Sequence, residues 1–354
     1  MICFCWCGFP QYGARCVGDF VKKHPEEDVV VVATRPRVPI KGMDELAGCP
    51  VYWVEGKVSL SYQVPEINPA AIRVLFVDGW SEPAFNEMRD DVRKAGGKVI
   101  CMVDNNLQFH QIGRFMIPTF KEVLKSIRFR ALLRKRYDGY FVPGEAGRKF
   151  FSFYGVSQSL VKTGFYSADS KVFFDGKPLD ERAKEIIYVG QFCERKNVIR
   201  MVKAFMAANK NHDWRLALYG NGPLKDELLT LAKDSCDCVK INDFMQPEQL
   251  AAKYRESKVF CLTSVEEHWG LVVHEAALSG CILCLSNRIG AADDFITDAN
   301  GCSFNPFNED SIKLAFEKVM NLDSDALKAA HKMSLKVSKK ASLEKFSKNA
   351  GEWL

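Results

Sequence analysis

The second half of the chain alternates short apolar runs with longer amphipathic segments. The apolar runs predict strands at 185–189, 215–219, 238–241, 259–263, 281–285 and 301–304. Apolar residues three or four positions apart predict helices at 197–209, 223–233, 247–256, 271–279, 291–296, 309–320, 325–340 and 343–354. Strands that alternate with helices of this length indicate β-α-β units, and hence a parallel sheet covered on both faces.

The first half shows the same pattern less regularly. Strands are predicted at 2–7, 29–34, 74–77, 98–102 and 139–142, and helices at 14–23, 82–94 and 121–136. The predicted fold class is therefore α/β, with two doubly wound, Rossmann-like domains facing across a cleft. The expected limits are 1–166 for the first domain, 167–182 for a linker, 183–338 for the second domain and 339–354 for a C-terminal helix. In such sheets ligands bind beyond the carboxyl ends of the strands.

Length and charge narrow the class of protein. A chain of 354 residues with 47% apolar and 26% charged residues has room for two packed cores. Its apolar runs are too short to span a bilayer, no signal peptide is predicted, and we expect a cytoplasmic protein. Residues 1–165 hold 23 Lys and Arg against 17 Asp and Glu, whereas the remainder is almost balanced. This surplus favours an anionic partner for the first half but is too small to predict nucleic-acid binding.

Thirteen cysteines are scattered through apolar stretches. An odd number without zinc spacing favours buried free thiols in a reducing compartment, and a metal or redox site is the alternative. Cys281 and Cys284 form a C-x-x-C, but it lies within a predicted strand.

The strongest candidate for chemistry follows the strand predicted at 259–263. The string Ser264-Val265-Glu266-Glu267-His268-Trp269-Gly270 leads into a helix that contains Glu275. Gly270 allows close approach of a ligand to the backbone, and the first amides of a helix attract anions. A sugar with a phosphate would suit these amides and the carboxylates of Glu267 and Glu275. The alternative is that Glu275 is an ordinary exposed helical residue.

Two further loops follow predicted strands. Gly190-Gln191-Phe192-Cys193-Glu194-Arg195-Lys196-Asn197 places two cations at the start of a helix, where they do not complement the helix dipole. They indicate either an anionic ligand or a solvated surface pair. Tyr219-Gly220-Asn221-Gly222-Pro223 has the composition of a tight turn between a strand and a helix.

In this order, the three strings and the turn Ile289-Gly290-Ala291-Ala292-Asp293-Asp294 resemble glycosyltransferase family 4. That family of retaining nucleotide-sugar transferases, also called glycosyl transferases group 1, has the GT-B fold. The resemblance is strong over 184–320 and faint over the first 136 residues. Gln191 stands where the family has arginine, and His268 and Trp269 stand where it has glycine and phenylalanine.

The resemblance implies that the domain at 1–166 is the acceptor side and that the domain at 183–338 holds the nucleotide-sugar donor. It also implies a role for each matching residue of this donor domain. Glu275 would hold the ribose hydroxyls, Glu267 the hydroxyls of the donor sugar, and Lys196 the diphosphate. Backbone amides at Gly270, Leu271 and Val272 would meet the sugar or the diphosphate. Arg195 and Gln191 would lie beside the phosphates, and the nucleobase would rest at 242–245, which includes Phe244.

The resemblance also implies two elements in the first domain. The loop from Gly8 to Gly13 would face the diphosphate, although an ordinary turn is the alternative. Asp104, after the strand at 98–102, would be the catalytic residue near the reacting carbon, with Asp78 as the alternative. Either aspartate could instead cap a helix or turn, and His110 is a further candidate. The helix at 339–354 would cross back to this domain.

These features predict a retaining glycosyltransferase that uses a nucleotide-diphosphate sugar, with UDP expected rather than GDP, and a saccharide or lipid-linked acceptor. The product would belong to polysaccharide or glycolipid assembly. No cofactor or metal is expected, since Asp323-Ser324-Asp325 is interpreted as a helix cap. A nucleotide-sugar 2-epimerase and a non-catalytic sugar-nucleotide-binding protein remain alternatives. A nicotinamide dehydrogenase is disfavoured because no G-x-G-x-x-G follows a first strand.

The helix predicted at 121–136 is strongly basic. It combines Leu124, Ile127, Phe129, Leu132 and Leu133 with seven cations: Lys121, Lys125, Arg128, Arg130, Arg134, Lys135 and Arg136. It is either a packed helix with a solvated basic face or a peripheral contact with an anionic membrane that carries the acceptor.

Overall fold

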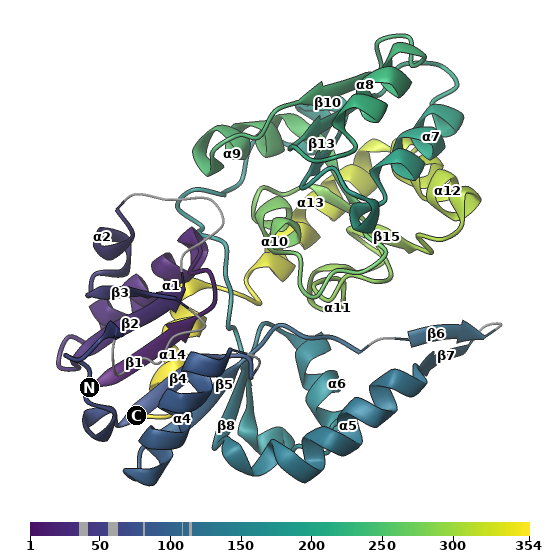
Figure 1. Ribbon diagram of the computed structural model, residues 1–354. Helices are drawn as coiled ribbons and strands as arrows, with labels where there is room; N and C mark the ends of the chain where they lie inside the picture. Colours follow the sequence, from purple (N-terminus) through teal and green to yellow (C-terminus); the bar gives the residue numbers. More distant parts are fainter. Residues whose placement is uncertain (35–41, 56–62, 81, 108, 113–114) are drawn as a thin grey trace. The chain divides into compact units, whose positions relative to one another are not determined.

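The computed structural model describes residues 1–34, 42–55, 63–80, 82–107, 109–112 and 115–354. The chain forms two compact units, shown in Figure 1. The first comprises Met1–Ser167 together with Ala341–Leu354, and the second comprises Ala168–Lys340. Each unit is built on its own parallel sheet, as the sequence predicts.

The first unit contains a seven-stranded sheet in the order β3-β2-β1-β4-β5-β8-β9. Its strands are β1 (Ile2–Trp6), β2 (Val29–Thr34), β3 (Val51–Val54), β4 (Val74–Asp78), β5 (Lys98–Met102), β8 (Gly139–Val142) and β9 (Val161–Thr163). Every neighbouring pair is parallel. A separate antiparallel pair, β6 (Phe109–Ile112) and β7 (Phe115–Pro118), precedes the basic helix.

Helices cover both faces of this sheet because alternate strand residues point to opposite sides. They are α1 (Gln11–Lys23), α2 (Met43–Ala47), α4 (Pro83–Lys94), α5 (Phe120–Leu132), α6 (Glu145–Phe153) and α14 (Leu343–Gly351). On one face Phe4 stacks on Phe76 with ring centroids 4.5 Å apart, beneath Phe20 of α1. On the other face Cys3 and Cys5 join a buried cluster with residues of α4, α5 and α6.

Helix α14 packs on α1 although more than 300 positions separate them in the chain. Its Phe346 lies 5.2 Å from the ring of Phe141, and its Ser347 hydroxyl donates to Asp19 Oδ2 over 2.6 Å. The chain therefore returns, after Lys340, to the unit in which it began.

The second unit contains a six-stranded parallel sheet in the order β12-β11-β10-β13-β14-β15. Its strands are β10 (Ala183–Val189), β11 (Arg215–Tyr219), β12 (Val239–Asn242), β13 (Ser257–Leu262), β14 (Ile282–Ser286) and β15 (Gly301–Phe304). Its helices are α7 (Val198–Ala208), α8 (Lys225–Lys233), α9 (Pro247–Glu256), α10 (Leu271–Leu278), α11 (Ala292–Phe295), α12 (Glu309–Met320) and α13 (Ser324–Ser338). Helix α7 packs with α8 and α12, while α10 packs with α9, α11 and α13.

Residues 168–182 differ from the linker expected there, because they pack into the second unit. The Arg182 side chain is buried and donates to the carbonyls of Lys177 at 2.6 Å and Ser279 at 2.9 Å. It also donates to the carbonyls of Ser257 and Tyr254. One guanidinium thus ties this segment to the sheet, since a buried charge must satisfy its donors.

Several local predictions are confirmed and others need correction. All thirteen cysteines are free, Cys281 and Cys284 are buried, and Asp323 caps α13 by accepting from the Ala326 amide at 2.8 Å. Helix α8 starts at Lys225 rather than at Pro223. Six elements were not predicted from the sequence, and they are short or contain glycine: α2, β3, β6, β7, α6 and β9.

Candidate active site

Four loops meet at the carboxyl edge of the second sheet, after β10, β11, β12 and β13. The strand order reverses between β10 and β13, which is the switch point where open α/β sheets hold ligands. Two hydrogen bonds join the loops that follow these strands. The Val265 amide donates to the Arg195 carbonyl at 2.9 Å, and the Thr263 hydroxyl donates to the Lys196 carbonyl at 2.9 Å.

Lys196 and Glu267 form an ion pair at this switch point. Lys196 is only 8% exposed, and the same carboxylate oxygen accepts from Arg195 Nη1 at 3.1 Å and from the Ser264 hydroxyl at 3.1 Å. A solvated surface pair is therefore the wrong interpretation for Lys196, whereas Arg195 is exposed. The structure thus brings two sequence-predicted cations, Lys196 and Arg195, to the carboxylate of a third predicted residue, Glu267.

Backbone conformation explains how the loop after β13 presents Glu267. The Glu267 amide donates to the Arg288 carbonyl at 3.1 Å, and the Gly290 amide donates to the Glu267 carbonyl at 3.1 Å. This short parallel bridge holds the loop against the turn that follows β14. Gly270 then adopts φ +89° at the N-cap of α10, a conformation that residues with a Cβ rarely adopt. Leu271 and Val272 follow as the first residues of that helix, both partly exposed.

Glu275 lies one turn further into α10, where Tyr254 of α9 donates to its Oε2 at 3.2 Å. Burial raises the pKa of the Glu275 carboxyl to about 7, and the bond from Tyr254 opposes this only in part. Glu275 is thus a partly buried carboxylic group rather than an ordinary exposed helical residue. No sequence signal pointed to Tyr254, which lies 21 positions earlier.

Two of the three residues that depart from the family pattern, Trp269 and His268, differ in burial. Trp269 is buried, and its ring lies 5.8 Å from that of Phe295 in α11. Its indole N–H has no hydrogen-bond partner among the described residues. His268 is exposed, with Nε2 3.5 Å from a Glu266 carboxylate oxygen.

Close packing of two turns explains the glycines after β10 and β11. A Cβ on Gly220 would lie 1.9 Å from the carbonyl oxygen of Gly190, so no other residue fits there. The Phe192 amide donates to the Asn221 carbonyl at 2.9 Å, which joins the turns. Gln191 is exposed, and its carbonyl accepts from the Tyr188 hydroxyl at 2.9 Å.

The residues predicted to meet the nucleobase follow β12. Phe244 is 66% exposed, and it is one of several large apolar side chains that the described chain exposes. Its neighbour Asp243 forms an ion pair with Lys225 of α8. The role of Phe244 at the nucleobase stays a prediction.

The sheet of the first unit has its own switch point, between β1 and β4. The Cys7 amide donates to Asp78 Oδ2 at 3.0 Å, and the Gly8 amide donates to the Thr34 hydroxyl at 2.7 Å. Gly8 has φ +63°, as expected for a turn. Gly13, however, lies inside α1 rather than in a loop, where an added Cβ would touch the Trp6 ring at 3.0 Å. Its glycine serves packing.

Asp78 is the last residue of β4, and Asp104 follows the neighbouring strand β5 at the same edge. Burial raises the pKa of Asp78 to about 7, and the nearby Asp104 adds to this while the Cys7 amide opposes it. Burial also raises the pKa values of Tyr12 and Tyr166, with Asp104 and Asp78 contributing. Two aspartates and two tyrosines thus share one site, of which the sequence analysis had identified only the aspartates. The side chain of His110 lies outside the described residues.

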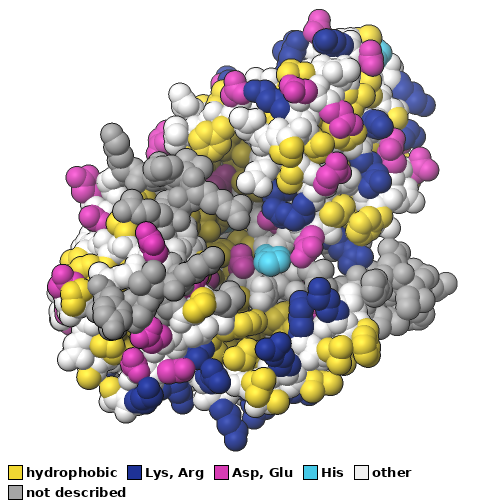
Figure 2. Space-filling view, viewed as in Figure 1, with side chains coloured by type: hydrophobic (Ala, Val, Ile, Leu, Met, Phe, Trp, Pro, Cys, Tyr) yellow, Lys and Arg dark blue, Asp and Glu magenta, His cyan; other side chains and the backbone are white. Residues whose placement is uncertain are grey.

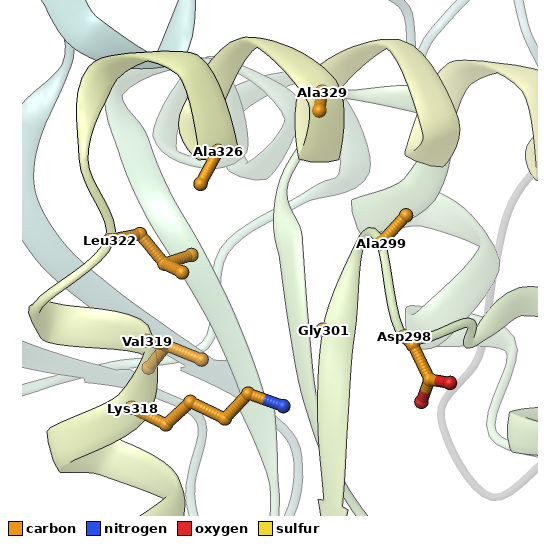
Figure 3. Close-up of a pocket in the computed structure, with 8 residues that line it drawn as sticks. All are labelled: Asp298, Ala299, Gly301, Lys318, Val319, Leu322, Ala326 and Ala329. Carbon is orange, nitrogen blue, oxygen red and sulfur yellow. The ribbon is translucent and has the colours of Figure 1, made fainter.

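A cavity of about 200 Å³ lies elsewhere in the second unit, as Figure 3 shows. It opens beside Gly301, at the start of β15, and is lined mainly by Val319, Leu322, Ala326 and Ala329. Since β15 begins there, this cavity is at the amino edge of the sheet rather than beside Lys196. The described residues contain no group of three His, Cys, Asp or Glu side chains that could hold a metal ion.

Comparison with known proteins agrees with this geometry. Residues 169–340 match the family described as Glycosyl transferases group 1. This segment, slightly less than half of the chain, is similar to that family. It contains every residue predicted for the donor site in the second unit, from Gln191 to Glu275.

Curated relatives match parts of the chain. One relative is the N-acetylgalactosamine-N,N'-diacetylbacillosaminyl-diphospho-undecaprenol 4-alpha-N-acetylgalactosaminyltransferase of Campylobacter jejuni, to which the chain is 30% identical over 162 residues. This alignment covers 45% of this chain and 42% of the relative. The chain is 25% identical over 144 residues to an uncharacterized glycosyltransferase of Methanocaldococcus jannaschii, covering 39% and 36%. The matches thus span less than half the length of either relative.

Solved structures show that the fold of the whole chain is GT-B. The HepE protein of Anabaena, solved in complex with UDP, matches with a TM-score of 0.75 and 14% identity over 99% of both chains. The lipopolysaccharide outer core galactosyltransferase WaaB matches with a TM-score of 0.72 and 13% identity, again over 99% of both chains.

Proposed function

We propose that the protein is a glycosyltransferase that moves a sugar from a UDP-sugar to an acceptor hydroxyl. The observation that carries this proposal is the pair formed by Lys196 and Glu267 at the switch point of the 168–340 sheet, next to the N-terminus of α10. A buried ammonium beside helix amides provides positive charge for a diphosphate, and a carboxylate can accept from sugar hydroxyls. The similarity of residues 169–340 to the family described as Glycosyl transferases group 1 supports the same proposal.

In the proposed complex the diphosphate replaces part of the carboxylate contact of Lys196. The freed Glu267 oxygen then accepts from a hydroxyl of the sugar, while Glu275 accepts from the ribose. Arg195 and the amides of Leu271 and Val272 supply further donors. Positive charge fixed where the leaving diphosphate develops negative charge lowers the barrier, and it replaces the metal ion used elsewhere.

We propose that the reaction retains the anomeric configuration. The bond between the sugar carbon and the diphosphate oxygen breaks while the acceptor oxygen attacks the same face. The acceptor proton moves to the departing diphosphate oxygen, so no enzyme nucleophile is needed. Asp104 would orient the acceptor hydroxyl, with Asp78 as the alternative.

The acceptor is proposed to be a lipid-linked saccharide of glycolipid or polysaccharide assembly. This rests on the Campylobacter relative, whose name specifies an undecaprenol-linked substrate. It is also consistent with the positive surplus of the first 165 residues, since lipid diphosphates are anionic.

Thermal shift with a panel of UDP- and GDP-sugars tests the donor. Stabilisation by UDP-sugars that Glu275→Ala abolishes would support the proposal, whereas no shift with any nucleotide would contradict it. Incubation with the donor alone then separates the reactions: a transferase releases UDP only slowly, while a 2-epimerase converts the sugar. Nuclear magnetic resonance of the product linkage tests retention, and inversion or a covalent sugar adduct on Glu267 would refute the proposed mechanism.

A further inference from the structure

Helix α5 exposes its apolar face to solvent. Phe120, Leu124 and Ile127 are 77%, 51% and 58% exposed, and Val123 lies between them on the same face. Their spacing of three or four positions places them in one stripe along the helix. Figure 2 shows hydrophobic and basic side chains side by side over this helix. Soluble helices normally turn such a stripe toward the core.

The opposite face of α5 is buried and largely polar. Glu122 and Ser126 are buried there, and the Tyr154 hydroxyl hydrogen-bonds to Glu122 Oε1. Phe129 is the apolar anchor, with its ring 5.3 Å from that of Tyr154 and 5.5 Å from that of Trp80. The helix is also fixed at its start, where the Thr119 hydroxyl accepts from the Glu122 amide at 3.1 Å. Its orientation is therefore set by specific contacts that leave the apolar stripe outward.

Cations flank the exposed stripe. Lys121, Lys125 and Arg128 follow one edge of it at spacings of four and three, and Lys135 and Arg136 extend the charge beyond the helix. Within the described residues Lys121, Arg128, Lys135 and Arg136 have no ion-pair partner, while Lys125 lies 3.7 Å from Glu122. Unpaired cations beside an apolar stripe match the chemistry of an anionic lipid surface, with acyl chains below acidic headgroups.

We infer that α5 docks the protein on an anionic membrane, with Phe120, Leu124 and Ile127 entering the acyl boundary. The helix lies in the plane of the interface, and none of the helices in the described chain is long and apolar enough to cross a bilayer. This inference deepens the proposed function, on which it partly rests, because a docked enzyme would reach a lipid-linked acceptor without extracting it.

A second copy of the chain fits this face less well than a membrane. In a symmetric dimer each cation near the axis would face its own counterpart, which is repulsive. The stripe is also only one helix wide, whereas a stable dimer buries about 800 Å² on each partner. Charge complementarity therefore favours lipid.

Co-sedimentation of the full chain with vesicles tests the inference. One set contains phosphatidylcholine with phosphatidylglycerol, and the other phosphatidylcholine alone. Wild-type protein is expected to bind the anionic set and to be released by salt.

The variant F120S/L124S/I127S should lose at least about tenfold in binding. The variant K121Q/R128Q should lose about fivefold for each cation removed. The control L229S/L314S, which removes two exposed leucines from the second unit, should bind as wild type.

Two measurements make the result decisive. Circular dichroism checks that the variants fold, since all three replaced apolar side chains are exposed. Light scattering without vesicles reports the oligomeric state. The inference is overturned if wild-type protein does not prefer anionic vesicles. It is also overturned if wild-type protein does not bind vesicles and is instead a dimer that the triple variant converts to monomer. Thermal shift with UDP-sugars keeps the two proposals apart, because the triple variant should retain a full donor shift.

Discussion

Lys196 and Glu267 are 71 positions apart in the chain, yet the ammonium of one contacts the carboxylate of the other. Strands β10 and β13 are neighbours in the sheet, and each of the two residues lies in the loop after one of them. Because Lys196 is buried, this contact holds its ammonium at a fixed place. The guanidinium of Arg195 is exposed and would not be held as firmly on its own.

The first prediction concerns that fixed charge. Lys196→Ala is expected to lower kcat for sugar transfer by about 100- to 1000-fold, because the proposed mechanism would lose one preorganised donor to the departing diphosphate. Arg195→Ala, at an exposed neighbouring cation, should cost less than about tenfold. Initial rates with a saturating UDP-sugar measure both. Equal effects of the two variants would contradict the special role of Lys196.

The second prediction concerns Glu275. Its pKa of about 7 in the folded protein exceeds the value of about 4.3 for an unfolded chain, so the folded state keeps a proton that the unfolded state loses. The free energy of unfolding should therefore fall as pH rises from about 4.3 to about 7. Glu275→Gln removes this loss of stability. At pH 8 its free energy of unfolding should therefore exceed that of wild type by about 1–3 kcal/mol.

Urea unfolding of Glu275→Gln and wild type across this pH range checks the sign, since Asp78 contributes equally to both proteins. Glu227→Gln, on the exposed face of α8, is the matched control and should follow the wild-type curve. A Glu275→Gln curve parallel to that of wild type would rule out the raised pKa.

The third prediction concerns Arg182. Replacing it with Met leaves the buried carbonyls of Lys177, Tyr254, Ser257 and Ser279 without this donor. We expect destabilisation of about 3 kcal/mol or more. Arg215→Met, at an exposed position that starts β11, should change stability by less than about 0.5 kcal/mol. Hydrogen exchange over 168–182 locates the effect, and unchanged protection there would disprove the anchoring role.

The fourth prediction separates two aspartates. Asp104→Asn should lower kcat for transfer while leaving the UDP-sugar thermal shift intact, because its proposed role is on the acceptor. Asp78→Asn removes a buried carboxyl with a raised pKa, so it should stabilise the first unit above pH 7 rather than abolish turnover. The opposite pattern of rates would assign the catalytic role to Asp78.

Much of the fold could be predicted from the sequence because local periodicity carries it. Strand β11 and helices α9 and α12 have the predicted limits, since turn residues or proline mark their ends. Helix α6 was missed because its Gly147 and three phenylalanines are weak helix formers. Gly147 packs on Val142, and a Cβ at this position would come within 2.6 Å of that side chain. Contact with the sheet therefore explains the glycine, which local helix preference does not.

The candidate site was predictable residue by residue but not as a set of contacts. The strings around Lys196 and Glu267 identified both residues, yet their pairing depends on which strands adjoin. The partnership of Glu275 with Tyr254 likewise arises from the packing of α9 on α10. Sequence alone gave no reason to expect α5 to bury Glu122 and expose Phe120.

The return of α14 to the first unit has a consequence for synthesis. Until residues 341–354 leave the ribosome, Phe4 and Phe141 lack the Phe346 ring that covers them. The second unit, Ala168–Lys340, is continuous and can complete its core earlier, although its codons are read later. In the nascent chain the aromatic surface of the first unit would therefore stay exposed, and accessible to chaperones, until α14 packs on it.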